Sequence, residues 1–431
     1  MMVALPQAKA DLLAARIAGL GFDAAGWTVP AREAALARLT SMGLPGKRDE
    51  YWRYTDPASL TAPVALPAKV FAAADESPAF DGIDQVRLVF VDGVFDAAAS
   101  DDPAIAGIEI ERLAVAARAD IHWAREVYGV LETRGQSPVA RPLAALNTAF
   151  ATDGVLIRVT GIVALPVALI YHHTSMTSDA ILHHCVKIEA GAGMTLLESG
   201  PAAARFNAVL EVEVGAGGQF HHIRLQGRDH ERRAVTHIFA RLAEAAQFKS
   251  FTLTRNGRLT RNEAVVELSG DDAVAHIAGA AVGDGEFVHD DTVFVTHAGQ
   301  RCESRQVFKK VLKNGAVGVF QGKILVKRGA QKTDGYQISQ SLLLDEDSQF
   351  LAMPDLEIYA DDVKCSHGST SGAIDDTALF YLRSRGVPAA DAKALLVLAF
   401  LAEAIGEIDD AAVAEDIRAR LEAWLTRHEG R

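Results

Sequence analysis

HHCVKIEAGAGMTLLESG, residues 183–200, and AVLEVEVGAGGQFHHIRL, residues 208–225, share one layout: a strand, a tight glycine-rich turn and a second strand. The Glu-Ala-Gly-Ala-Gly that begins at Glu189 matches the Glu-Val-Gly-Ala-Gly that begins at Glu213, 24 residues later. Similar turns at a similar interval suggest that this part of the chain is built from a repeated unit.

The repeat continues beyond these two segments. Gln219 and the following Phe match Gln247 and its Phe 28 residues later, and Arg241 matches Glu267 after 26 residues. A loose repeat of this length with little helix favours a β-solenoid, in which stacked coils bury a shared core. An antiparallel sandwich also has short strands, but it does not require similar turns at a nearly constant interval.

The chain divides into three regions around this repeat. Residues 1–148 form an N-terminal, largely helical region, in which the Asp-Gly of VRLVFVDGVFD predicts a hairpin turn. Residues 149–370 form the β-helix core, and residues 371–431 form a C-terminal helical region. We expect the C-terminal helices to cover the open end of the solenoid, where strand edges would otherwise lack partners.

The composition is that of a folded, acidic protein. The 431 residues are 49% apolar and carry a net charge of −13, which argues against nucleic acid as a partner because such binding needs a basic surface. The most apolar run, residues 394–405, is too short to span a membrane, and we find no signal peptide. Cys185, Cys302 and Cys365 are too few and too scattered for a disulfide framework. We therefore expect a soluble protein of the reducing cytoplasm.

No nucleotide-binding loop is found. GVFQGKI resembles part of a phosphate loop, but Val317 stands where the motif needs its first Gly, and Ile324 stands where it needs Ser or Thr. We interpret these and the other glycine-rich stretches as solenoid turns. If ATP is used, a partner must bind it.

The histidines and two of the cysteines offer weak sites. Three histidine pairs are adjacent in sequence: His172-His173, His183-His184 and His221-His222. Neighbours on a strand point to opposite faces, so no pair chelates a metal by itself, and we expect them on the surface or in turns. Cys302, with His297 and His289 before it, could form a catalytic pair, but no oxyanion motif accompanies it. Cys185 lies in an apolar strand pattern and is expected in the core.

ADDVKCSHGSTSGAIDD, residues 360–376, contains the best candidate ligands. Cys365 and His367 are two residues apart on an extended segment, so their side chains point the same way. Two ligands are half a metal site at best, although Asp361 and Asp362 could contribute oxygen. The residues are either a core Cys beside an exposed His, or half of a site that another chain completes.

Several long blocks resemble the SufB/SufD family of scaffold proteins for iron–sulfur cluster assembly. The longest is PDLEIYADDVKCSHGSTSGAIDDTALFYLRSRGV, residues 354–387. QGKILVKRGAQKTDGYQ, HAGQRCESRQVFKKVL, ALNTAFATDGVLIRV, GLPGKRDEYWRYTD and VFVDGVFD also match the style of the family. The resemblance covers essentially the whole chain.

Within the family, the chain looks like the SufD branch. SufB-like chains carry a His-Glu-Ala-Thr type sequence where this chain has SHGST, and a cysteine where it has Leu382. The resemblance implies a mainly β fold, with a right-handed parallel β-helix core flanked by helical N-terminal and C-terminal regions, in agreement with the solenoid predicted from the repeat. It also implies that His367 is the candidate iron or cluster ligand at a subunit interface.

The resemblance implies partners as well. The chain would join SufB and the ATPase SufC, and it would form a homodimer when SufB is absent. The candidate residues for SufC docking are Asp375, Asp376, Leu379, Phe380, Tyr381, Arg383 and Arg385. The chain would be a non-enzymatic scaffold that binds no cofactor tightly alone and holds an iron–sulfur cluster transiently in the complex. Two other interpretations stay open: a diverged SufB-like scaffold, and a secreted carbohydrate-active β-helix enzyme with carboxylates on adjacent coils.

Overall fold

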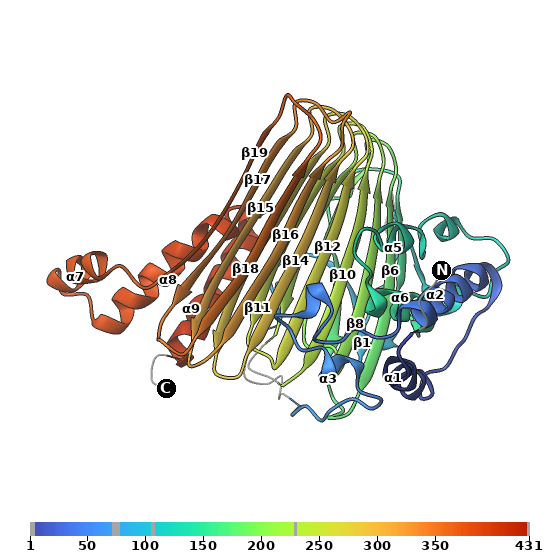
Figure 1. The fold of residues 1–431 in the computed structure, drawn as a ribbon, viewed down its shortest axis with the longest axis horizontal. Helices are drawn as coiled ribbons and strands as arrows, with labels where there is room; N and C mark the ends of the chain where they lie inside the picture. Colours follow the sequence, from blue (N-terminus) through green and yellow to red (C-terminus); the bar gives the residue numbers. More distant parts are fainter. Residues whose placement is uncertain (1–4, 71–77, 105–107, 228–230, 429–431) are drawn as a thin grey trace.

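The computed structural model describes residues 5–70, 78–104, 108–227 and 231–428. Most of them form a parallel β-solenoid with helices near both ends of the chain (Figure 1). Consecutive strands from β4 to β19 alternate between two sheets, and within each sheet these strands run parallel. The β-solenoid predicted from the repeat, and the mainly β, parallel β-helix core that the resemblance implies, are therefore confirmed.

Sheet A has ten strands in the order β19-β17-β15-β13-β11-β9-β7-β5-β1-β2. Their bounds are β1 (Val86–Val91), β2 (Val94–Asp96), β5 (Val167–His172), β7 (Gly193–Ser199), β9 (Gln219–Gln226), β11 (Gln247–Arg255), β13 (Val274–Asp284), β15 (Glu303–Lys313), β17 (Asp334–Leu343) and β19 (Lys364–Gly372). β1 and β2 form the hairpin predicted at the Asp-Gly turn.

Sheet B has nine strands in the order β18-β16-β14-β12-β10-β8-β6-β4-β3. Their bounds are β3 (Ile108–Arg112), β4 (Val155–Val159), β6 (Asp179–Ile188), β8 (Arg205–Val214), β10 (Arg233–Leu242), β12 (Leu259–Leu268), β14 (Val288–His297), β16 (Val317–Val326) and β18 (Gln349–Ile358). Strands from the N-terminal region thus extend both sheets.

The strand register tests the repeats. Gln219 pairs with Gln247 and Arg241 with Glu267, as their sequence matches predict. The match of Glu189 to Glu213 is wrong by two residues, because Glu213 pairs with Lys187. The physical reason is the turn: the left-handed position that favours glycine is occupied by Gly191 (φ 69°) in one coil and by Gly217 (φ 63°) in the next.

The N-terminal helices cover one side of sheet B. They are α1 (Gln7–Ile17), α2 (Val29–Met42), α3 (Ala58–Thr61), α4 (Leu113–Ala116), α5 (Val130–Arg134) and α6 (Pro142–Phe150), with short 3₁₀ turns at Gly26–Thr28, Glu50–Trp52 and Trp123–Glu126. α6 packs on β6 and β8, and α5 packs on β8 and β10 (Figure 1). Every residue of α6 is buried, so this region and the solenoid share one core.

The C-terminal helices are α7 (Asp376–Ser384), α8 (Ala389–Ile405) and α9 (Ala411–His428). α8 and α9 bury an apolar stripe that includes Val397, Leu401 and Trp424 against the outer face of sheet A, at Leu253 and Val307 among others. The prediction that these helices cover the open end of the solenoid is therefore wrong. Their stripe matches the apolar outer face of the sheet, and burial there removes more apolar surface from water than a strand edge offers.

Two smaller predictions concern glycines and the membrane. Gly318 and Gly322, the glycines of the GVFQGKI stretch, lie inside β16 and not at a turn, so that interpretation of their place was wrong. A strand does not wrap a phosphate as the glycine-rich loop of that motif does. Within the described part of the chain, no helix has both the length and the apolar character needed to cross a membrane.

Candidate functional site

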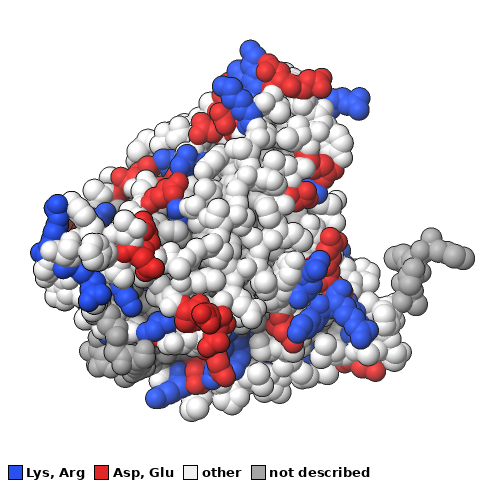
Figure 2. Space-filling model, turned by 60° about the vertical axis from the view of Figure 1, so that its left-hand side comes forward, with Lys and Arg blue, Asp and Glu red and all other residues white. Residues whose placement is uncertain are grey.

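Among the residues that the structure describes, no element covers the last coil of the solenoid. β18 and β19 are the final strands of their sheets, ten and nine residues long. Seven of the nine residues of β19 are exposed, and β18 is only half-buried along most of its length. Figure 2 turns this side of the molecule forward and shows a broad surface free of charged residues between charged margins.

The free edge of β19 offers backbone hydrogen bonds. The N–H of Lys364 donates to the carbonyl oxygen of Thr333 at 2.8 Å, at the start of the ladder with β17. Because alternate residues of a strand face its two neighbours, the N–H and C=O groups of His367 and Ser369 point away from β17. A long edge of this kind is a template for a further strand.

His367 lies in the middle of this edge. It pairs in register with Gln337 of β17, which places its side chain on the inner face of the sheet, at the mouth of the solenoid. The side chain is exposed, and within the described residues its ring has no hydrogen-bond partner. Asp361 and Asp362 lie in the turn before β19, and at about 3.3 Å per residue Asp362 is too far along the chain to share a metal with His367.

Cys365 is packed against neighbouring side chains and is less exposed than His367. It is half-buried, and a Cβ atom at Gly335 would lie 3.2 Å from its Sγ. It contacts a small apolar cluster that includes Ile324 and Val326. Burial raises the pKa of the Cys365 thiol, which favours the protonated form over a thiolate ligand. This geometry fits a core Cys beside an exposed His.

Two family models match the chain. The one described as "SufBD protein N-terminal region" matches residues 24–169, and the one described as "SUF system FeS cluster assembly, SufBD core domain" matches residues 171–400. The chain belongs to the SufBD family.

Named SufBD relatives agree with this assignment. The chain is 30% identical over 409 residues to the iron–sulfur cluster assembly protein SufD of Escherichia coli, a match that covers 91% of this chain and 92% of that protein. It is 28% identical over 277 residues to SufD of Bacillus subtilis, covering 62% and 63%. It is 28% identical over 408 residues to the SufBD family protein slr0076 of Synechocystis, covering 88% and 86%. The resemblance to the SufD branch is confirmed, and the chain has a scaffold role in iron–sulfur cluster assembly.

α7 of this SufBD chain stands away from the solenoid (Figure 1). None of its residues is buried, and Phe380 and Tyr381 are 73% and 53% exposed. The carboxylate of Asp375 accepts the N–H groups of Thr377 and Ala378, so it caps the helix. The other residues predicted to bind SufC, Asp376, Leu379, Arg383 and Arg385, lie on or directly after the same short helix.

The prediction of surface or turn histidines is confirmed for His172 and wrong for most of the other paired histidines. His172 is exposed and His221 half-buried, but His173, His183, His184 and His222 are buried. The prediction is wrong for the histidines within strands β6 and β9 because both faces of these sheets are largely covered, the inner one by the opposite sheet and the outer one by helices. Neighbours that point in opposite directions are then both buried.

The Cys302 pair proposed as a catalytic possibility does not form. Cys302 is buried and its thiol donates to the carbonyl oxygen of Gly270 at 3.2 Å. The Nε2 atom of His297 lies 2.8 Å from the hydroxyl of Ser304 instead. Burial raises the pKa of Cys302 and lowers the pKa of His297 to about 4. An activated thiolate beside its base is not present here.

A buried cluster of His183, Cys185 and Glu211 escaped the sequence analysis. Their ligand atoms lie within 4.8 Å of one another, because Cys185 and Glu211 pair in register between β6 and β8. The Glu211 carboxylate accepts the N–H groups of Leu131 (2.7 Å) and Glu132 (3.0 Å) at the start of α5. Burial raises the pKa of Glu211 to about 8 and lowers the pKa of His183 to about 3. The cluster joins the N-terminal region to sheet B, and the expectation of a core Cys185 is confirmed.

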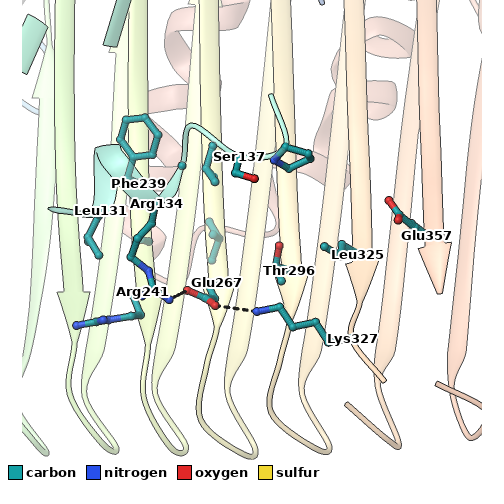
Figure 3. Close-up of a pocket in the computed structure, with 15 residues that line it drawn as sticks. Leu131, Arg134, Ser137, Phe239, Arg241, Glu267, Thr296, Leu325, Lys327 and Glu357 are labelled. Atoms are coloured by element: carbon teal, nitrogen blue, oxygen red, sulfur yellow. Dashed lines mark hydrogen bonds and ion pairs between the residues drawn. The ribbon is translucent and has the colours of Figure 1, made fainter. Parts of the chain in front are cut away.

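A cleft of about 440 Å³ lies on the outer face of sheet B beside α5 (Figure 3). Glu267 stands between Arg134 and Lys327 and pairs with both, the latter at 3.1 Å. Arg241 pairs with Glu213. Glu357, which also lines the cleft, pairs with Lys323 at 2.6 Å. Each charged side chain of the cleft thus has an ionic partner, and we assign the cleft no ligand. None of the site residues predicted from the sequence lines this cleft.

Proposed function

We propose that this chain is the SufD-type subunit of a SufBCD complex, and that His367 supplies an imidazole to iron or a nascent cluster at the interface with SufB. The observation that carries the proposal is a single exposed imidazole at the uncovered end of the solenoid. Imidazole is a good iron ligand. One ligand does not hold iron alone, so the remaining ligands must come from the chain that covers this end.

The free edge of β19 supports the proposed pairing with another chain. The backbone groups of β19 that point away from β17 can bond a strand of SufB, or a second copy of this chain when SufB is absent. A site divided between two chains forms and opens with the interface. A scaffold that must release its product needs this property, and the cluster is accordingly a transient cargo and not a resident cofactor.

The ATPase SufC is proposed to dock on α7. Phe380 and Tyr381 present exposed aromatic surface on a helix that lies apart from the body of the protein, and such residues commonly carry binding energy. The same helix and its ends supply charges around these aromatics, from Asp375, Asp376, Arg383 and Arg385. Leu379, next to Phe380 in the sequence, adds an apolar side chain. SufC would hydrolyse ATP and this chain would transmit the motion, without catalysis of its own, in the cytoplasm.

The test is a His367→Ala variant, co-expressed with SufB and SufC and compared with Cys365→Ala as a matched control. We expect a complex of normal subunit stoichiometry, because the exposed ring makes no contact that the fold requires, and a rate of cluster assembly lower by about tenfold or more. Cys365→Ala should change the rate far less. Cluster assembly at the wild-type rate in the His367→Ala complex would show that the ligand role is wrong.

A further inference from the structure

Successive strands of sheet A stack their side chains in columns, and one column ends at His367. Gln306 of β15 pairs in register with Gln337 of β17, and Gln337 pairs with His367 of β19. Register partners in a parallel sheet point to the same face. The three side chains therefore line the inside of the solenoid one above another, with His367 at the open end.

The two glutamines are unusual among the polar groups inside the solenoid. Both are 0% exposed, and their amide nitrogens and oxygens have no hydrogen-bond partner among the residues that the structure describes. Neighbouring inner hydroxyls are paired: Ser339 with Ser369 at 3.0 Å and Ser341 with Ser371 at 2.8 Å. A buried polar group without a partner costs about 1–3 kcal/mol, so stability alone does not explain the amides.

The interior is shaped around the Gln337 amide. A Cβ atom at Gly322, across the solenoid in β16, would lie 2.4 Å from the Gln337 Nε2. The missing side chain at Gly322 leaves the space that the amide occupies. Adjacent strands are about 4.8 Å apart, so His367 lies directly beside Gln337, whereas Gln306 is one strand further from the mouth.

We propose that Gln337 positions His367, with its side-chain carbonyl oxygen accepting an N–H of the imidazole while the other ring nitrogen binds iron. The proposal rests on the ligand role of His367. Histidines that bind metals nearly always donate their second ring N–H to an acceptor, which fixes the tautomer and the orientation of the ring. An unpartnered amide in the neighbouring position of the same column is suited to be that acceptor.

The experiment uses the complex of the full chain with SufB and SufC, and it measures the dissociation constant of Fe²⁺ and the urea unfolding midpoint of the chain. Gln337→Met keeps the length of the side chain and removes the acceptor; Gln306→Met makes the same change one coil deeper. We expect Gln337→Met to weaken Fe²⁺ binding by about 10–100-fold without lowering the midpoint, and Gln306→Met to leave Fe²⁺ binding unchanged. Gln337→Glu retains an acceptor oxygen and should restore binding.

The outcomes separate this inference from the ligand role itself. If Gln337→Met binds Fe²⁺ as the wild type does while His367→Ala binds it weakly, the positioning role is wrong and the ligand role stands. Equal weakening by Gln306→Met and Gln337→Met would mean a general packing effect and would also overturn the inference. If His367→Ala binds Fe²⁺ as tightly as the wild type, the ligand role fails first.

Discussion

The edge strands at the two ends of the solenoid differ in length and direction. At the first end, sheet A finishes in the three-residue β2 and sheet B in the five-residue β3, both antiparallel to their neighbours. At the last end, the ten-residue β18 and the nine-residue β19 finish without cover from the described part of the chain. Proteins normally shorten or cover their edge strands. The contrast supports the proposal that the last end is a surface for another chain, and the first end has the short strands of a finished boundary.

Stability should be concentrated at the covered end. Phe150 of α6 is 4% exposed against sheet B, whereas Tyr359, which follows β18, is 55% exposed. We expect Phe150→Ala to lower the free energy of unfolding by about 3–5 kcal/mol. Tyr359→Ala should change it by about 0.5 kcal/mol or less. Urea denaturation of both variants checks this, and similar losses would remove the contrast between the ends.

Acid should act on the covered part of the molecule. Burial lowers the pKa values of His184 and His237 to about 4. A histidine with a lowered folded-state pKa adds stability that is complete above its unfolded value, about 6.5, and is lost as the pH falls towards 4. Because of this shift, each of the two histidines should lower the free energy of unfolding by about 2 kcal/mol as the pH falls from 7 to 5.

The variant that tests the acid effect is His237→Leu, with unfolding free energies measured across this pH range. Its dependence on pH should be shallower than that of the wild type, since one buried titrating group is gone. An unchanged slope would show that His237 is not held neutral in the fold.

The free edge of β19 can be blocked without unfolding the chain. Ser369→Pro removes an N–H that points away from β17, and edge strands tolerate proline where no ladder bond is lost. We expect association with SufB, or with a second copy, to weaken by about tenfold or more. This is roughly the effect of losing one hydrogen bond and leaving its partner unpaired. Ser369→Ala keeps the N–H and serves as the control. Equal association of both variants would argue against edge pairing.

The aromatic surface of α7 gives an expected change of similar size to that at the β19 edge. Phe380→Ala should leave stability unchanged, because the side chain is 73% exposed, and should weaken SufC binding by about 1–2 kcal/mol. Phe22→Ala, a 41% exposed aromatic in the N-terminal region, should leave SufC binding as it is. Calorimetric titration with SufC measures both; weakening by Phe22→Ala alone would place the docking surface elsewhere.

The sequence predicted the parts of the molecule that depend on local pattern. The repeats that place Gln219 beside Gln247 gave the solenoid, and the KCSHG block gave His367. It could not predict where α8 and α9 pack, because their apolar stripe fits an outer sheet face as well as an open end. The buried histidines and the Glu211 carboxylate at α5 were missed for a related reason: their burial depends on the opposite sheet or on helices far away in the chain.

The most direct test of the central claim labels only this chain with nitrogen-15 histidine in the complex with SufB and SufC. Pulsed electron paramagnetic resonance of the reduced cluster then detects any labelled imidazole bound to iron. The account predicts a nitrogen-15 coupling in the wild-type complex that disappears in His367→Ala. A cluster that shows no such coupling, or one that persists in His367→Ala, would contradict it.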